Sequence, residues 1–381
     1  MSEKSVRFLH LADIHLGAEN QQLPEDKQAI WTEQIWQSFE QIIRETIHAR
    51  RPIQAVLISG DLFDSPNPAP TLVEKTVELF AEVEAKGIPI LLVPGNHDNI
   101  ISPDSVYHRE KFPAVVLLES PGISQPFKMT FSGIPVHFYG MAYSFLSEPP
   151  FDEFRPEDPE AVNIALIHGS VVRSTEWALH AQEVPLNVEK LFRTGFHYLA
   201  LGHYHNFQHW EQDERHIVYP GTLEPLSWKE TGERKIVILE VEPHRVLLNV
   251  LDSYHQRRRY LETKLDCQMH GIDSEDGLIQ HLCEKYRHPS LLFHVRLHGQ
   301  CVFIPNLEKI RQRCQEQFFF FKITDETQFV SREWLERFRE EKTIRGMAIR
   351  ELLRMESTAE GEEKVVVQEA LKILSGYFTS D

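Results

Sequence analysis

The sequence has few cysteines and no long apolar run, and each scarcity argues against a class of protein. The four cysteines among 381 residues are far apart, form no Cys-x-x-Cys pair and lie outside every histidine-rich motif, which disfavours a zinc ribbon and predicts reduced thiols. No apolar stretch approaches the ~20 residues that cross a membrane, and the charged start MSEKSVRFLH does not resemble a secretory signal. We therefore expect a cytoplasmic protein with no membrane segment.

Positive charge is also scarce in this chain. Lys and Arg number 40 against 57 Asp and Glu, which gives a formal net charge of −17. A large basic footprint for nucleic acid is therefore not expected. Bound metal cations are omitted from this count, however, and they can dominate the field around a site. The net charge weakens a nucleic-acid interpretation without excluding it.

The first 250 residues alternate short apolar strands with amphipathic helices. Strands are predicted within residues 6–13, 54–61 and 88–98, separated by helices over 26–50 and 70–86. This βαβαβ order implies parallel strands, whose ligands lie beyond their carboxyl ends. Six more strands follow from 114–120 to 235–241, and they suggest a second sheet packed on the first, with helices outside.

The composition changes near residue 256, where we place a domain boundary. A small α/β unit is expected over residues 256–328, and a charged helical tail over 329–381. An apolar stripe at helical spacing lies in this tail, formed by Val367, Ala370, Leu371, Leu374 and Phe378. Intramolecular packing is the commoner explanation of such a stripe, and a partner-binding face is the alternative.

Five polar clusters each end an apolar strand. They are Asp13 with His15, Asp61 with Asp64, Asn96 with His97 and Asp98, the single His168, and His203 with His205. Side chains two apart on a strand point to the same side, and glycines beside four clusters permit close backbone approach. Taken singly, each cluster has an ordinary explanation, such as an Asx turn or a hydrogen-bonded core histidine. Five such strand ends together predict one basin of ligands.

The donors in this basin favour particular metals. Carboxylate, amide and imidazole groups fit borderline divalent ions such as Mn²⁺, Fe²⁺ or Zn²⁺ better than Ca²⁺. Seven donors exceed what one ion needs, and Asp61 is the natural carboxylate to bridge two ions, an arrangement that promotes displacement at phosphorus. His97, flanked by Asp98, is expected to act as an acid and not as a ligand.

The motif set D-x-H, G-D-x-x-D, G-N-H-D, a lone His and G-H-x-H resembles the calcineurin-like metallophosphoesterase family over roughly residues 6–252. Within it, HLADIHLG, ISGDLFDS and YPGTLEPLSWKE are most similar to SbcD-type DNA repair nucleases and their YhaO-like branch. The resemblance implies a four-layer α/β/β/α sandwich over residues 1–255. It also implies a capping domain over 256–328 and C-terminal helices that bind a coiled-coil ATPase of the SbcC/Rad type.

The resemblance also implies roles for single residues. One metal would be held by Asp13, His15 and His205, the other by Asn96, His168 and His203, with Asp61 between them. His97 would protonate the leaving oxygen with Asp98 behind it, while Asp64, a histidine in some relatives, would lie behind the ligands. The arginines at 257–259 contact a phosphate backbone or are simply solvated.

The implied activity is a two-metal, Mn²⁺-dependent DNA exonuclease, expected to run 3′ to 5′, although the residues themselves do not fix the polarity. One alternative is a phosphodiesterase or phosphatase for small molecules, because the same ions serve any phosphate ester. The other is a mainly non-catalytic subunit that docks a DNA end or an ATPase. A homodimer is left open.

Overall fold

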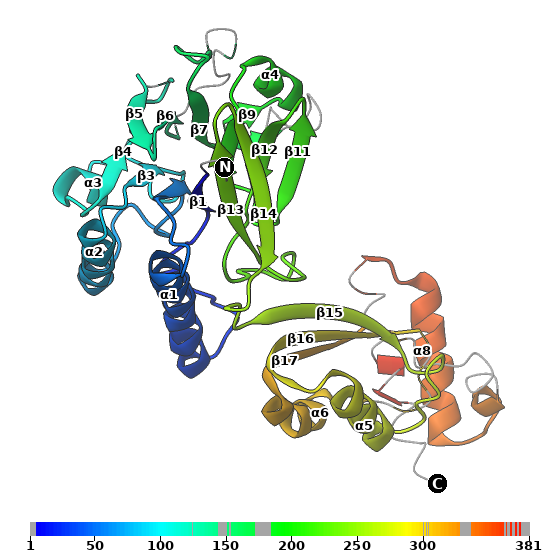
Figure 1. The fold of residues 1–381 in the computed structure, drawn as a ribbon. Coiled ribbons are helices and arrows are strands. Elements are labelled where there is room, and N and C mark those ends of the chain that lie inside the picture. Colours follow the sequence, from blue (N-terminus) through cyan, green and yellow to red (C-terminus); the bar gives the residue numbers. More distant parts are fainter. Residues whose placement is uncertain are drawn as a thin grey trace. The chain divides into compact units, whose positions relative to one another are not determined.

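The chain forms two compact units, residues 1–259 and 260–381. The structure is a computed structural model, and it describes residues 5–123, 125–143, 151, 154–171, 184–299, 301, 303, 305–327, 337–361, 363, 366–367, 370–371 and 373–374. Figure 1 shows the fold of both units, which are taken one at a time below. Within the described part of the chain, no helix has the length and apolar character needed to span a bilayer.

The first unit begins with the predicted alternation of strands and helices. Its opening elements are β1 (Val6–Leu11), α1 (Glu25–His48), β2 (Ala55–Ser59), α2 (Pro70–Ala85), β3 (Ile90–Val93), α3 (Val106–Arg109) and β4 (Val115–Leu117). The four strands are parallel neighbours. Two antiparallel strands, β13 (Lys235–Glu242) and β14 (Arg245–Asp252), complete the sheet in the order β14-β13-β1-β2-β3-β4.

The second sheet has the order β11-β12-β10-β7-β6-β5. Its strands are β5 (Phe127–Phe131), β6 (Ile134–Met141), β7 (Val162–His168), β10 (Tyr198–Gly202), β11 (Gln208–Gln212) and β12 (Arg215–Tyr219). Two short strands, β8 (Ser170–Val171) and β9 (Pro185–Leu186), pair beside it, and α4 (Val188–Arg193) follows them.

Two of the predicted strands join another sheet than expected, and four strands were not predicted. The segments around β4 and β13 were expected in the second sheet, but the structure adds them to the two sides of the first. An apolar run indicates a strand but not the sheet that it joins, because a buried strand has the same composition in either sheet. The strands β5, β9, β11 and β14 were not predicted. Most side chains of β14 are exposed, so it lacks a continuous apolar pattern.

The main core lies between the two sheets. Phe8 and Leu57 from the first sheet pack with Phe138 and Leu166 from the second. Leu191 of α4 belongs to a separate cluster on the other face of the second sheet. On the first sheet, alternate strand residues are also fully buried, and α1 and α2, which lie beside β1–β3 in Figure 1, bury their own apolar faces. The predicted four-layer α/β/β/α sandwich is confirmed.

The second unit is a small α/β fold followed by helices. It contains β15 (Arg259–Asp266), α5 (Glu275–Tyr286), β16 (His288–His298), α6 (Leu307–Cys314), a 3₁₀ turn (Gln315–Gln317), β17 (Phe318–Asp325) and α8 (Ile344–Thr358). Its core joins Phe293, Val295 and Leu297 of β16 to the buried faces of α5 and α6.

The apolar stripe of the tail takes part in this unit's own packing. Leu371 is buried and clusters with Ile349 of α8, and the partly buried Leu374 packs against the same cluster. Phe378 lies outside the described residues. The contacts seen are therefore those of intramolecular packing.

Candidate metal centre

The five predicted clusters meet at one end of the sandwich. They follow β1, β2 and β3 of the first sheet and β7 and β10 of the second. Neighbouring strands among these five run parallel within their own sheets, so their carboxyl ends lie at one edge of each sheet. Because the two sheets are packed face to face, donors separated by up to 190 residues come within contact distance.

The seven predicted metal ligands lie close together around Asp61. Ligand atoms of Asp13, His15 and His205 lie within 4.8 Å of one another, and so do those of Asp13, Asp61 and His168. Asp61 Oδ2 is 3.6 Å from His15 Nε2 and 3.4 Å from His168 Nε2. The structure thus places Asp61 between the two predicted groups.

Asn96 and His203 are the remaining two of the seven residues, and Asn96 links His203 to this cluster. Its Oδ1 lies 2.8 Å from His168 Nε2 and 3.3 Å from His203 Nδ1. The backbone N–H of His203 in turn donates to the carboxylate of Asp13, at 2.9 and 3.0 Å. All seven residues are therefore joined by short contacts.

The backbone at this edge is unusually constrained. Asp13, His15 and Asp61 have φ values of 52°, 51° and 51°, in the left-handed region that non-glycine residues avoid. A Cβ on Gly95 would lie 2.1 Å from Asp61 Oδ1, and one on Gly202 would lie 1.8 Å from a neighbouring carbonyl oxygen. A non-glycine residue in the left-handed region costs about 1–3 kcal/mol, and such residues are concentrated at functional sites.

The tautomers of the histidines test whether these residues suit a cation. His15 Nδ1 lies 2.8 Å from Asp64 Oδ1, and His205 Nδ1 lies 3.0 Å from Glu230 Oε1. A carboxylate only accepts hydrogen bonds, so each Nδ1 carries the proton and each Nε2 of a neutral ring presents a lone pair. These two Nε2 atoms face each other at 3.2 Å. Two facing lone pairs require a proton or a metal ion between them.

The same holds on the other side of Asp61. His168 Nδ1 lies 2.9 Å from the carbonyl oxygen of Ser59, which can only accept, so its Nε2 also presents a lone pair. That lone pair faces the oxygens of Asn96 and Asp61. Carbonyl and carboxylate partners behind metal-bound imidazoles fix the ring in this way in known metal sites. The donor set therefore fits divalent cations.

Burial makes the charged forms of the side chains in this cluster energetically unfavourable. The buried carboxyl of Asp13 has its pKa raised to about 8, mainly by the loss of water around it. Burial likewise lowers the pKa of His168 to about 4, which keeps the imidazole neutral. A nearby divalent cation favours both ligand forms, ionised carboxylate and neutral imidazole.

His97 lies at the rim of the centre, with 44% of its side chain exposed. Its Nδ1 is 3.3 Å from Asp64 Oδ1, and its ring meets the His15 ring edge-on at 4.6 Å. The hydrogen bond with Asp64 is the main reason that the pKa of His97 is raised to about 9. An exposed, protonated imidazole beside the predicted ligands has the properties of a proton donor.

Asp98 lies elsewhere than predicted. It was expected behind His97, but the carboxylate beside that imidazole belongs to Asp64. Asp98 is fully buried and accepts hydrogen bonds from the backbone N–H groups of Leu62, Phe63 and Gly95, at 2.9, 3.3 and 2.8 Å, and from a tyrosine hydroxyl at 2.6 Å. It ties the loops after β2 and β3 together, and its catalytic role stays a prediction.

Glu230 is a residue that the sequence analysis did not single out. It lies in the loop between β12 and β13, where it contacts His205, accepts from Ser227 Oγ at 2.8 Å and accepts from the backbone N–H of Leu226 at 2.9 Å. Arg234, from the same loop, donates to the carbonyl oxygen of His205 at 3.0 Å. No strand-end pattern marks Glu230, although it closes the quoted stretch YPGTLEPLSWKE.

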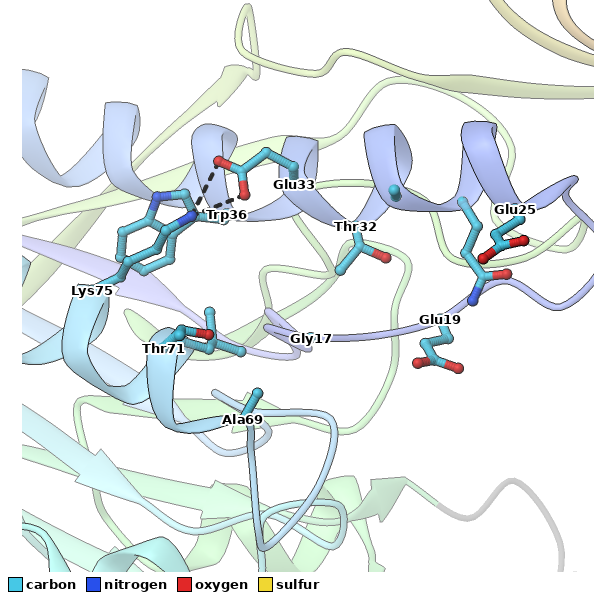
Figure 2. Close-up of a pocket in the computed structure, with 12 residues that line it drawn as sticks. Gly17, Glu19, Glu25, Thr32, Glu33, Trp36, Ala69, Thr71 and Lys75 are labelled. Carbon is cyan, nitrogen blue, oxygen red and sulfur yellow. Dashed lines mark hydrogen bonds and ion pairs between the residues drawn. The ribbon is translucent and has the colours of Figure 1, made fainter.

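A groove of about 500 Å³ opens between the starts of α1 and α2 and the chain that follows His15. Figure 2 shows the acidic side chains of Glu19, Glu25 and Glu33 along it. Lys75 is the one basic residue among those lining the groove, and its ammonium group is 3.0 Å from a Glu33 oxygen. The groove therefore presents no spare positive charge for a phosphate.

Comparison with known proteins places these observations in a family. Residues 6–207 match the family described as calcineurin-like phosphoesterase, more than half of the chain. The chain belongs to the calcineurin-like phosphoesterase family. The family predicted from the motifs is thus confirmed.

Two curated relatives are similar to this chain over part of their own length. The DNA double-strand break repair protein Mre11 of Methanopyrus kandleri is 28% identical over 244 residues, covering 60% of this chain and 51% of that protein. The metallophosphoesterase YhaO of Bacillus subtilis is 26% identical over 245 residues, which cover 62% of this chain and 57% of YhaO. The chain thus spans about half the length of the curated relatives it matches.

Solved structures overlap with this phosphoesterase only loosely. GAP50, the anchor in the inner membrane complex of Plasmodium, is 12% identical to this chain, with a TM-score of 0.40. The match covers 66% of this chain and 85% of GAP50. An overlap this weak does not bear on function.

Proposed function

We propose that this phosphoesterase binds two divalent ions, preferably Mn²⁺, and hydrolyses phosphodiester bonds in DNA. The observation that carries the proposal is the set of imidazole and carboxylate lone pairs that face one another around Asp61. Asp13, His15 and His205 would hold one ion, and Asn96, His168 and His203 the other. Asp61 would contact both ions. Fe²⁺ and Zn²⁺ suit the same donors and are kept as alternatives to Mn²⁺.

Divalent cations in such a centre supply positive charge that activates water and neutralises the phosphate. The protein's own groups orient and protonate. Asp64 holds the rings of both His15 and His97, at 2.8 and 3.3 Å, so it aligns a ligand with the proton donor. His97 is placed to donate a proton to the departing oxygen of the ester.

DNA as the substrate is supported by the relatives named for DNA double-strand break repair, which are similar to more than half of this chain. The net charge of −17 means that the chain offers little nonspecific attraction to DNA by itself. A DNA end would then be presented by the proposed SbcC/Rad-type ATPase. A homodimer, the 3′ to 5′ polarity and a cytoplasmic location also remain predictions.

Hydrolysis of a small phosphodiester is the second candidate function. One observation favours it: the net charge of −17 disfavours a long polyanion such as DNA more than a small ester with a single charge. The two candidates use the same ions and the same proton donor, so only a comparison of substrates separates them.

The experiment is an assay of the purified full chain with end-labelled duplex DNA and with bis(4-nitrophenyl) phosphate, each in Mn²⁺, Mg²⁺, Fe²⁺ or Zn²⁺. We expect Mn²⁺-dependent shortening of the DNA from its 3′ ends. Asp61→Asn should lose both metal and activity, while His48→Ala, a change at an exposed histidine of α1, should lose neither. Turnover of the small ester without any cleavage of DNA, with or without the ATPase, would overturn the DNA proposal.

A further inference from the structure

The hairpin formed by β11 and β12 carries a second group of metal-binding side chains, outside the centre described above. Asp213 and Glu214 join the two strands, with φ values of 50° and 58°. Positive φ at both positions is the requirement of the two-residue type I′ turn, whose twist matches the flanking strands. This turn fixes the register, so that Gln212 pairs with Arg215 and Glu211 pairs with His216.

The register places three side chains on one face of the hairpin. His209 and Glu211 are two apart on β11 and point to the same side, and His216 lies directly across from Glu211 on β12. Nitrogen or oxygen atoms of all three lie within 4.8 Å of one another. They line a groove of about 460 Å³ that also includes residues of β14.

The hydrogen bonds of His216 aim a lone pair into this group. Its Nε2 lies 3.0 Å from the carbonyl oxygen of Val246, which can only accept, so Nε2 carries the proton. Nδ1 therefore has a free electron pair, and it faces His209 Nε2 at 3.1 Å and Glu211 Oε2 at 3.9 Å. Burial lowers the pKa of His209, and this keeps its ring neutral and able to coordinate.

The spacing of the two rings matches that of zinc ligands. Zn–N bonds of about 2.0–2.1 Å in tetrahedral geometry place two imidazole nitrogens about 3.3–3.4 Å apart. The observed 3.1 Å between His209 Nε2 and His216 Nδ1 needs a shift of only a few tenths of an ångström. Glu211 is 57% exposed, so its carboxylate is free of tight packing and can turn toward the ion.

We propose that His209, Glu211 and His216 bind a borderline divalent ion, Zn²⁺ in the first place, at a site separate from the phosphoesterase centre. Three protein ligands and water complete a tetrahedral shell. Val246, on β14 of the first sheet, orients His216 of the second sheet, as carbonyl groups behind metal-bound histidines do. The ion would cross-link β11 to β12 at the edge of the second sheet and so stabilise the first unit. The alternative is a plain hydrogen bond between the two imidazoles.

The test measures Zn²⁺ stoichiometry of the full chain by equilibrium dialysis and elemental analysis. We expect His209→Ala to lower the Zn²⁺ content by one equivalent and Glu211→Gln to weaken that equivalent at least tenfold. His48→Ala, an exposed histidine on α1, should leave the content unchanged. Asp61→Asn, which disrupts the proposed two-metal centre, should retain the hairpin equivalent, so failure of one site is distinguishable from failure of the other.

Anomalous scattering at the zinc edge then locates the ion. A peak between His209 and His216 is expected, and Zn²⁺ should raise the unfolding temperature of the Asp61→Asn variant but not that of a variant that also carries His209→Ala. Equal Zn²⁺ content in the wild-type chain and the His209→Ala variant, with no peak at the hairpin, would overturn the proposal and leave the imidazole hydrogen bond as the explanation.

Discussion

Glu224 predicts a measurable loss of stability as the pH rises through its folded-state pKa of about 7. Its carboxyl group is 2% exposed and accepts hydrogen bonds from Ser38 Oγ at 2.6 Å and from the backbone N–H groups of Arg257 and Arg258 at 2.7 and 3.0 Å. Burial outweighs these bonds and raises the pKa of Glu224 from 4.5 to about 7. The protonated form is therefore the one that the folded state favours.

The sign and size of the effect follow from this pKa. A carboxyl group whose pKa is higher in the folded state contributes stability that is complete below the unfolded value and is lost as pH rises through the folded value. With values of 4.5 and about 7, the free energy of unfolding should fall by roughly 1.3 kcal/mol between pH 6 and pH 8 from this group alone. Glu224→Gln removes the titration while keeping a hydrogen-bonding side chain of the same shape.

The assay measures urea unfolding of the wild type and of Glu224→Gln at pH 6 and pH 8. A spectroscopic probe in the first unit monitors the unfolding. The difference in unfolding free energy between wild type and Glu224→Gln should shift by about 1.3 kcal/mol toward the variant as pH rises. Other titrating groups cancel in this double difference because they are common to both proteins. A difference that stays constant from pH 6 to pH 8 would show that Glu224 is already ionised at pH 6 and would refute the reasoning.

Three further changes test the centre itself. His97→Ala should lower kcat for the ester about 10²- to 10⁴-fold, the usual range for a proton donor, with metal content unchanged. Glu230→Gln should weaken metal binding about 10- to 100-fold in a calorimetric titration, since it removes the carboxylate behind His205. Gly95→Ala should abolish tight metal binding, because its Cβ would lie 2.1 Å from Asp61 Oδ1.

Matched variants control for general damage. Glu233→Gln, an exposed neighbour in the same loop, and Gly122→Ala, where an added Cβ meets nothing within 4 Å, should bind metal as the wild type does. Loss of metal from His97→Ala would contradict its assignment as a proton donor. Unchanged affinity in Glu230→Gln would mean that His205 is held by its backbone alone, and tight binding by Gly95→Ala would mean that the loop after β3 can shift.

The location of the centre was predictable from sequence because it depends on a rule of topology. Polar residues that follow parallel strands lie at one edge of their sheet, so Asp13, Asp61 and Asn96 could be brought together without coordinates. The apolar runs also predicted most strands of the sandwich, but not β5, β9, β11 or β14. Which sheet each strand joins was less predictable, since β4 and β13 carry the same apolar composition as their neighbours, and the exposed β14 has no such signal.

The partners behind the ligands could not be predicted, because they depend on side-chain directions in loops. Asp98 follows His97 in sequence, yet its carboxylate turns away into backbone amides, while Asp64 reaches the imidazole from 33 residues upstream. Glu230 reaches His205 across 25 residues of chain. Adjacency in sequence is a poor guide to orientation where the chain is neither helix nor strand.

The seven residues of the centre come from both sheets, so the centre forms only when both sheets have folded and packed together. His15 and His205 are 190 residues apart. During synthesis, the residues of the centre near the N-terminus therefore cannot contact His205 until nearly the whole sandwich has been made. Neither sheet alone holds the full set, and an ion that binds only the assembled form adds its binding energy to the stability of that assembly. Cells short of the right metal would then accumulate a less durable protein as well as a less active one.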